Sequence, residues 1–155
     1  MKPVFIMMVG LPASGKSTYS AKLKDAYHAV VLSSDDLRAV FGESKNDQSV
    51  TVEVFAYMQR ESIARLNNGV SVIYDATNIS AYRRIEMLKK LADVDCRKIC
   101  VEVRRSYEAC RASLAGRDHD VPEYALKKMA EQYEAPSYEE GWDEIKVINV
   151  DEVLK

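Results

Sequence analysis

Short apolar runs alternate along the chain with stretches in which apolar residues recur at helical spacing. Five short, mainly apolar runs predict strands at residues 4–9, 29–32, 70–74, 99–103 and 145–148, and the unbroken run at 4–9 is typical of a strand buried on both faces. Helical spacing predicts helices after residue 16 and at 37–41, 50–67, 85–92, 107–114 and 122–133. This alternation predicts an α/β fold, with a five-stranded, mainly parallel sheet that carries helices on both faces.

Two polar segments interrupt the pattern. Residues 42–49 are charged and rich in turn-forming residues, so we expect the most flexible part of the first half there. Residues 115–121 form a second polar loop, after which Pro122 suits the first position of a helix. No internal repeat or linker divides the chain, so we expect a single domain over residues 1–155.

The composition is that of a globular domain, with 47% hydrophobic and 30% charged residues. The formal net charge of −2 gives no global attraction to nucleic acids or acidic membranes, so a polyanionic substrate has to be held locally. Three cysteines in unpatterned positions favour reduced thiols. No apolar run approaches the roughly 20 residues needed to span a bilayer. We therefore expect a cytoplasmic protein, without a cleaved signal because the chain begins with a core strand.

The stretch GLPASGKST at residues 10–18 fits the phosphate-loop pattern G-x-x-x-x-G-K-[ST] between a predicted strand and a predicted helix. Its backbone N–H groups and the start of the helix would surround an anion. We expect ATP to be held by Gly10, Ala13, Ser14, Gly15, Lys16, Ser17 and Thr18. Lys16 would reach the β- and γ-phosphates, and the Ser17 hydroxyl would hold Mg²⁺. A glycine-rich turn with a chance lysine is the alternative.

The second predicted strand ends in the polar sequence SSDDLR at residues 33–38. The carboxyl end of a strand in an open parallel sheet faces the ligand crevice. A carboxylate there could accept the proton of an attacking hydroxyl. Arg38, three residues after Asp35, could bind a phosphate of the substrate with two hydrogen bonds. Alternatively, Asp35 and Asp36 cap a helix and Arg38 makes a surface ion pair.

The third predicted strand leads into DATN at residues 75–78. Asp75 stands where an acid can order the coordination shell of Mg²⁺, although a strand-ending turn explains Asp and Asn equally well. Thr77, Asn78 and the nearby Arg83 are candidates for contact with the substrate. The pairs Arg83–Arg84 and Lys89–Lys90 otherwise suggest a solvated helix face.

Arg111 and Arg117 flank a polar loop that precedes the helix beginning near Pro122. An arginine on such a loop can close over the triphosphate as part of a lid and neutralise charge on the transferred group. A solvated surface arginine is the alternative for each residue. His119 has no partner in the sequence, and we interpret it as a loop residue.

Taken together, GLPASGKST, SSDDLR, DATN and the arginine loop before Val121-Pro122-Glu123 resemble the polynucleotide 5′-hydroxyl kinase family, over essentially the whole chain. The resemblance is to the kinase domains of bacteriophage polynucleotide kinase and of bacterial RNA-repair kinases. It implies a P-loop kinase with an arginine-bearing lid. It also implies Asp35 as general base, Arg38 as a contact of an acceptor phosphate and Arg117 as the lid arginine.

The sequence therefore predicts an ATP-dependent kinase that uses Mg²⁺ and acts on a hydroxyl, with a single-stranded nucleic-acid 5′ end as the preferred acceptor. The catalytic residues would be Asp35, Lys16 and Arg117, and the metal residues Ser17 and Asp75. Two alternatives stay open at this point. One is a P-loop kinase for a nucleoside, sugar or antibiotic, and the other is an ATP-binding regulatory protein without an acceptor.

Overall fold

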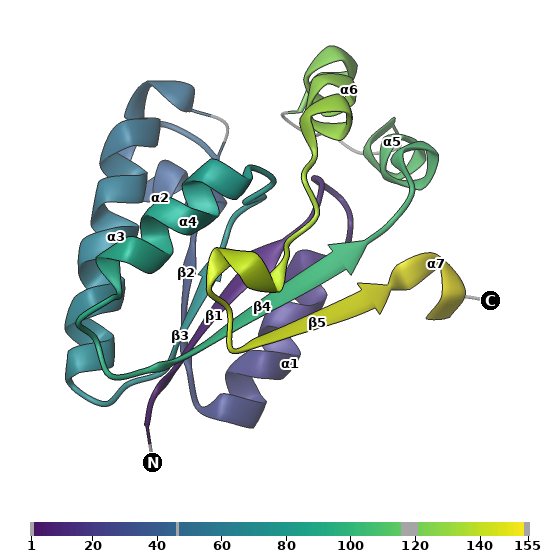
Figure 1. Cartoon of the computed structure of the whole chain (residues 1–155). Coiled ribbons are helices and arrows are strands. Elements are labelled where there is room, and N and C mark those ends of the chain that lie inside the picture. Colours follow the sequence, from purple (N-terminus) through teal and green to yellow (C-terminus); the bar gives the residue numbers. More distant parts are fainter. Residues whose placement is uncertain (1, 46, 116–120, 154–155) are drawn as a thin grey trace.

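Five strands form one sheet at the centre of the molecule (Figure 1). In a computed structural model that describes residues 2–45, 47–115 and 121–153, they are β1 (Val4–Val9), β2 (Val30–Ser33), β3 (Val72–Asp75), β4 (Arg97–Arg104) and β5 (Glu144–Asn149). Their order is β2-β3-β1-β4-β5, and every pairing is parallel. The predicted sheet is confirmed, and over the described ranges it is wholly rather than mainly parallel.

Helices cover both faces of the sheet. They are α1 (Lys16–Tyr27), α2 (Ser34–Phe41), α3 (Thr51–Asn67), α4 (Ala81–Lys90), α5 (Tyr107–Ala115), α6 (Glu123–Gln132) and α7 (Val150–Val153), with short 3-10 turns at Gln48–Val50 and Tyr138–Glu140. Figure 1 shows α2, α3 and α4 on one side of the sheet, α1 on the other, and α5 and α6 beyond the carboxyl ends of the strands. Those ends are therefore the edge at which the sheet can hold a ligand.

The central strand β1 sends alternate side chains into two cores. Phe5, Met7 and Val9 face the layer of α3 and α4, whereas Ile6 and Met8 face α1. The first core also contains buried residues of α3, α4 and the segment before β5, which are Val54, Met58, Leu66, Met87, Leu88 and Trp142. Because both faces of β1 are covered, its sequence is apolar without interruption.

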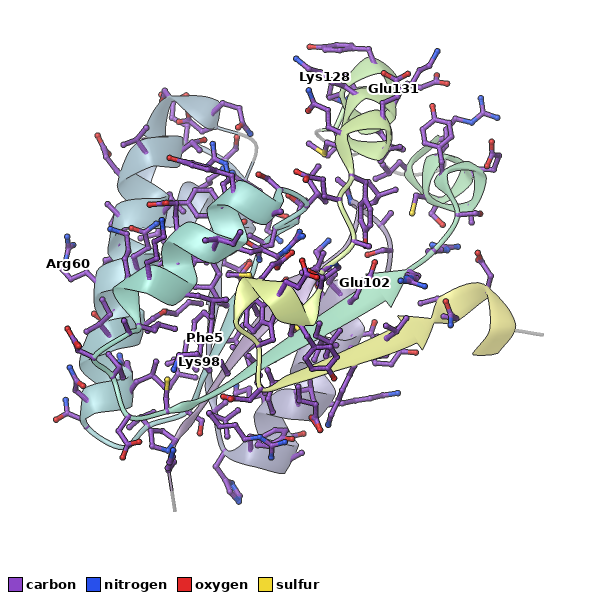
Figure 2. All side chains as sticks on the ribbon, in the orientation of Figure 1. Phe5, Arg60, Lys98, Glu102, Lys128 and Glu131 are labelled. Atoms are coloured by element: carbon purple, nitrogen blue, oxygen red, sulfur yellow. The ribbon has the colours of Figure 1, made fainter. Side chains whose placement is uncertain are left out.

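Charged side chains lie mainly outside these cores, although a few, Glu102 and Arg84 among them, are buried. Figure 2 shows Arg60, Lys128 and Glu131 pointing away from the ribbon, while Phe5 is enclosed. Glu102 on β4 is charged and yet only 1% exposed. A buried carboxylate needs hydrogen-bonding or charged partners to offset its lost hydration.

Helices α5 and α6 pack against each other above the loop that follows β1. Their contact is built from Cys110, Leu114 and Leu126, together with Leu11 of that loop. This pair occupies the position of the predicted lid. Arg117, the predicted lid arginine, lies outside the described residues.

Several element ends differ from the sequence-based expectation. Helix α2 begins at Ser34 rather than at residue 37, because the Ser33 hydroxyl accepts a hydrogen bond from the Asp36 N–H at 3.4 Å and caps the helix. Strand β3 begins at Val72, since the Val70 N–H bonds back to the Arg65 carbonyl at the end of α3. Pro122 is the cap of α6 rather than its first residue, and α7 was not predicted.

Candidate functional site

The loop between β1 and α1 has the tight backbone that its glycines predict. Ala13 and Gly15 are left-handed, with φ of 66° and 103°. A Cβ on Gly10 would lie 2.6 Å from the Ser14 hydroxyl oxygen and 2.8 Å from the Val103 carbonyl oxygen, so no side chain fits there. The Gly10 N–H donates to the Thr77 carbonyl at 3.0 Å, which ties this loop to the end of β3.

The loop presents an electropositive surface. No side chain caps the start of α1, so its first N–H groups remain available to an anion. The Lys16 ammonium donates to the Leu11 carbonyl at 3.0 Å and therefore spans the loop. Burial lowers the pKa of Lys16 below its ordinary value, while the charges of Asp75 and Asp35 act in the opposite direction. Two carboxylates thus lie within electrostatic reach of the same ammonium.

A cavity of about 630 Å³ opens above this loop. Sequence-predicted residues that line it are Ala13, Gly15, Lys16, Ser17, Thr18, Asp35, Arg38, Asp75 and Thr77. The lid contributes Leu114, Val121 and Met129. Gly10 and Ser14 belong to the same loop but do not line the cavity, and Ser14 is 1% exposed. Three separate motifs of the sequence therefore meet at one hollow.

Helix α2 brings Asp35 and Arg38 to the wall of this cavity. The Arg38 Nη1 donates to the Asp35 Oδ1 at 3.0 Å, and the guanidinium lies 5.9 Å from the centre of the Phe55 ring. The Asp35 side chain is 68% exposed, whereas that of Arg38 is 12% exposed. The Arg38 Nε is buried without a hydrogen-bond partner. An orphaned donor in a cavity wall is a position where a ligand oxygen can bind.

Asp75 lies deeper, at the end of β3. It is 8% exposed, and its Oδ2 accepts a hydrogen bond from the Ser20 hydroxyl at 3.2 Å. Burial raises the pKa of Asp75, although the charge of Lys16 and the Ser20 hydroxyl oppose that shift. A bound cation would favour the ionised form of this buried carboxyl group.

The donors present fit Mg²⁺ rather than a cation that needs an all-protein cage. Over the described residues, no group of three or more His, Cys, Asp or Glu side chains gathers at one place. Mg²⁺ typically uses one or two protein oxygens and takes its other ligands from phosphates and water. Asp75 and the exposed Ser17, both in the cavity wall, can supply such oxygens.

Two predicted substrate contacts are not brought into the cavity. The Asn78 amide donates to the carbonyls of Met8 at 2.7 Å and of Ala76 at 3.3 Å. Arg83 is exposed on α4 and lines neither cavity described here. Arg111, the other lid candidate, pairs with Glu123 at 3.2 Å and is 52% exposed. Arg84, the neighbour of Arg83, was expected on a solvated helix face. That expectation is wrong, because Arg84 is fully buried.

Arg105 is a cavity residue that the sequence analysis missed. It follows the last residue of β4, its Nη1 donates to the Ala13 carbonyl at 2.8 Å, and its Nε is buried without a partner. A cation directly after a central strand was the available signal, since strand ends in parallel sheets face ligands. Lys45 also lines the cavity, from the segment expected to be flexible.

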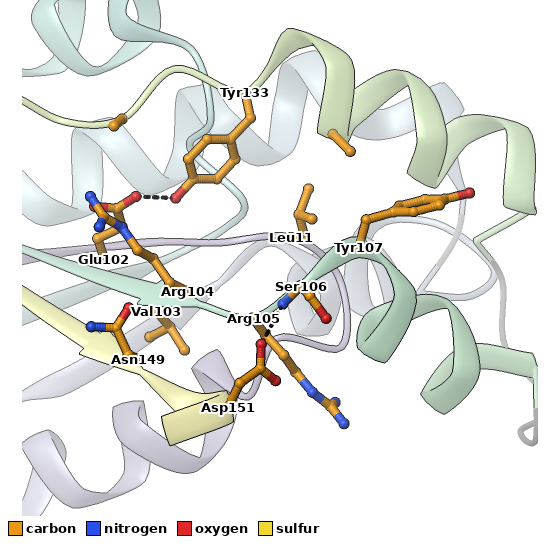
Figure 3. A pocket seen from close by; sticks show the side chains of 12 residues that line it. Leu11, Glu102, Val103, Arg104, Arg105, Ser106, Tyr107, Tyr133, Asn149 and Asp151 are labelled. Atoms are coloured by element: carbon orange, nitrogen blue, oxygen red, sulfur yellow. Dashed lines mark hydrogen bonds and ion pairs between the residues drawn. The ribbon is translucent and has the colours of Figure 1, made fainter. Parts of the chain in front are cut away.

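A second cavity, of about 560 Å³, lies beside the first and shares Arg105 with it. Figure 3 shows Tyr107, Tyr133, Asn149 and Asp151 around it. The Asp151 carboxylate accepts from the Ser106 N–H at 3.0 Å, which fixes the turn after β4.

The buried Glu102 finds its partners at this second cavity. It accepts hydrogen bonds from the Tyr133 hydroxyl and from Arg104, the latter at 3.1 Å. Burial, followed by the hydrogen bond and charge of Glu102, raises the pKa of Tyr133. Tyr133 is the C-cap residue of the lid helix α6, so this bond joins the lid to the sheet.

Comparison with known proteins identifies a matching family model and several relatives. A family model described as AAA domain matches residues 5–136. Among curated proteins, Protein kti12 of Schizosaccharomyces pombe is 24% identical over 89% of this chain and 54% of its own length. The L-seryl-tRNA(Sec) kinase of Methanococcus maripaludis is 24% identical over 90% of this chain and 56% of its own length. The chain thus spans about half the length of these relatives.

Solved structures share the fold. Kti12 of Chaetomium thermophilum in complex with ADP-AlF3 has a TM-score of 0.72 and 20% identity, covering 95% of this chain and 89% of that one. A chain of the Pnkp1/Rnl/Hen1 RNA repair complex has a TM-score of 0.71 and 24% identity, covering 84% and 44%. A sugar kinase from Janibacter has a TM-score of 0.68 and 15% identity, covering 96% and 86%. These likenesses establish a P-loop kinase fold. None of the helices in the described ranges has the length and apolar character of a membrane span.

Proposed function

The chain belongs to the AAA domain family, and from that premise we propose that it is an ATP-dependent kinase with a hydroxyl group as acceptor. We further propose that the acceptor is the 5′-OH of an RNA or DNA end. The observation that carries this proposal is the shared cavity, in whose wall Asp35 and Arg38 stand together with the phosphate-loop residues Lys16 and Ser17.

The donor side is supported by the loop and the adjoining cavity. The free N–H groups of α1 and the Lys16 ammonium suit the β- and γ-phosphates of ATP. The second cavity begins at Arg105 and offers the Tyr107 ring and the Asn149 amide, which suit a nucleobase. Ser17 and Asp75 would hold Mg²⁺, which would supply positive charge to neutralise the phosphates.

The acceptor side is supported by the chemistry of α2. The exposed Asp35 carboxylate can accept the proton of the incoming hydroxyl as its oxygen attacks the γ-phosphorus and the bond to the β-phosphate oxygen breaks. Lys16 stabilises the charge that spreads over the transferred group. The Lys16 contact to Leu11 keeps its ammonium at the loop before substrate arrives. Any contribution of Arg117 is also a proposal, because that residue lies outside the described ones.

A phosphate-bearing acceptor is favoured by Arg38. Its guanidinium is largely buried, and one donor, Nε, has no partner. A buried unsatisfied donor costs about 1–3 kcal/mol, so a ligand that supplies an oxygen there gains that energy. An acceptor with a phosphodiester next to its 5′-hydroxyl does so, whereas a neutral sugar has no charged oxygen to offer.

End labelling tests the proposal directly. The protein is incubated with Mg²⁺, γ-labelled ATP and 5′-hydroxyl RNA or DNA of several lengths, with 5′-phosphorylated oligonucleotides and the Lys16→Met variant as controls. We expect label on the 5′-hydroxyl substrates alone, and none with Lys16→Met. Absence of label from every RNA and DNA length would rule out the polynucleotide acceptor.

A small-molecule kinase is the second candidate. It is favoured by the limited size of the cavity and by the net charge of −2, which offers no extended basic track for a nucleic acid. Nucleosides and sugars belong in the same labelling assay, and a preference for them over oligonucleotides would select this candidate. An ATP-binding protein without an acceptor would label none of these compounds while still binding ATP.

A further inference from the structure

Arg84 of α4 is fully buried, with 0% of its side chain exposed. Its Nε and Nη2 donate to the two carboxylate oxygens of Glu140 at 2.8 and 2.9 Å. Glu140 is 6% exposed and also accepts from the Trp142 indole N–H at 3.0 Å. Burial opposes the charge on Arg84, but the hydrogen bonds and charge of Glu140 prevail and raise the pKa of Arg84.

The remaining nitrogen of Arg84 reaches the turn that carries Asp75. Its Nη1 donates to the Asn78 carbonyl at 2.8 Å. Asn78 has a left-handed backbone with φ of 47°, and its amide donates to the Met8 carbonyl of β1. The neighbouring Thr77 carbonyl accepts from the Gly10 N–H of the phosphate loop. Arg84 thus contacts the segment after β3 that is hydrogen-bonded to β1 and to the phosphate loop.

We propose that Arg84 is a positioning residue that locks the turn at residues 75–78 against the phosphate loop and so fixes Asp75 relative to Ser17. The inference rests on the proposed function for the role of Asp75 toward Mg²⁺. Arg84 itself lines neither cavity and touches no substrate in this proposal.

The ion pair alone does not account for the arginine. Replacing a buried ion pair by apolar residues of similar volume is often neutral or stabilising. What an apolar pair cannot provide is the third hydrogen bond, to the Asn78 carbonyl. That bond holds a left-handed, non-glycine residue, a conformation that costs energy unless its surroundings enforce it.

The test is a double substitution, Arg84→Met with Glu140→Met, which removes both buried charges together. Mg²⁺ is titrated calorimetrically into the protein with saturating ADP, and ADP into the protein with a chelator present. We expect the affinity for Mg²⁺ to fall by about 10- to 100-fold, as when a partner that orients a metal ligand is lost. The affinity for ADP without Mg²⁺ should stay unchanged. The partly exposed pair on α3 provides the matched control, Glu61→Met with Arg65→Met, and should leave both affinities as in the wild type.

Milder variants keep the test decisive if the double variant does not fold. Glu140→Gln weakens the hold on Arg84 and should lower the Mg²⁺ affinity by a smaller factor than the double variant does. Arg84→Lys, which keeps the positive charge, should likewise lose less Mg²⁺ affinity than the double variant. Unchanged Mg²⁺ affinity in a folded double variant, or in Glu140→Gln where the double variant is unfolded, would overturn the proposal. So would a wild type whose ADP complex binds no Mg²⁺. If Mg²⁺ affinity falls as expected but no acceptor is labelled, the positioning role stands and the proposed function fails.

Discussion

Two regions at the carboxyl edge of the sheet each contain an aspartate and an arginine, and they use them in opposite ways. In α2, Asp35 is exposed, and Arg38 keeps one buried donor without a partner. In the β3–α4 region, Asp75 is buried, and the Arg84 guanidinium donates its hydrogen bonds to Glu140 and Asn78. The first region is incomplete until a ligand binds, whereas the second is complete within the protein. The incomplete one is therefore where substrate recognition is to be sought.

The largest effect is expected from Asp35→Asn. Loss of the proposed general base should lower the rate of the proposed phosphoryl transfer by about 10²–10⁴-fold. ATP affinity, measured by calorimetry, should stay near that of the wild type. The adjacent Asp36→Asn is the matched control, because Asp36 lies in the same helical turn but not in the cavity wall. Equal rates for Asp35→Asn and the wild type would remove the base from the mechanism.

A stability measurement separates the two arginines. Arg84→Met alone leaves the Glu140 carboxylate buried and unpaired, which should lower the free energy of unfolding by about 3–5 kcal/mol. Arg38→Met leaves an exposed carboxylate and should change it by about 0.5 kcal/mol or less. Urea denaturation of both variants measures the difference. Similar losses would mean that Arg38 is as structural as Arg84.

Although replacing Arg38 should have little effect on stability, it should have a clear effect on activity. Arg38→Ala is expected to lower kcat/KM by about 10- to 100-fold on a 5′-hydroxyl oligonucleotide, as for the loss of a hydrogen bond between charged groups. On a nucleoside the loss should be smaller, because no phosphate is there to be held. Arg97→Ala, which removes an exposed arginine paired with Glu144, is the control. An equal loss on both acceptors would argue against a phosphate contact.

The smallest effect concerns the buried Asp75 and its pH dependence. Its pKa in the folded protein is raised above the ordinary 3.8, mainly by burial. The stability from its protonated form is complete below the pKa of the unfolded chain and is lost as the pH rises through the folded pKa. Asp75→Asn should therefore melt at a higher temperature than the wild type at neutral pH, by an amount that shrinks as the pH falls toward 4. Adding Mg²⁺ with ADP should stabilise the wild type more than the variant.

A melting difference that stays constant across this pH range would mean that burial of the Asp75 carboxylate costs little. Equal stabilisation of both proteins by Mg²⁺ with ADP would take Asp75 out of the metal site.

The sequence predicted the fold because each strand carries its own local signal. The unbroken run at β1 and the helical spacing of α3 leave few alternatives. The phosphate loop was recognisable because its glycines and Lys16 occur at fixed spacing. The sequence also predicted that Asp35 and Asp75 lie near that loop, because parallel strands bring their carboxyl ends to the same edge of the sheet.

Other features depend on contacts that no local pattern records. Arg84 looked like half of a solvated pair because its partner, Glu140, is 56 residues away. Asn78 looked like a substrate contact, but its amide is used by a carbonyl 70 residues away. Arg105 stands alone after β4, and only the return of the phosphate loop beside it makes it a cavity residue.

Arg105 borders both hollows at once, the one above the phosphate loop and the one between Tyr107 and Asn149. A molecule bound in either cavity changes the surroundings of Arg105, which also lines the other cavity. The free energies with which inorganic triphosphate and a free nucleoside bind should therefore not sum to that of the intact nucleotide, since sites with a common residue are coupled. The two halves of the nucleotide would therefore contribute to binding in a coupled way, and not as two independent fragments.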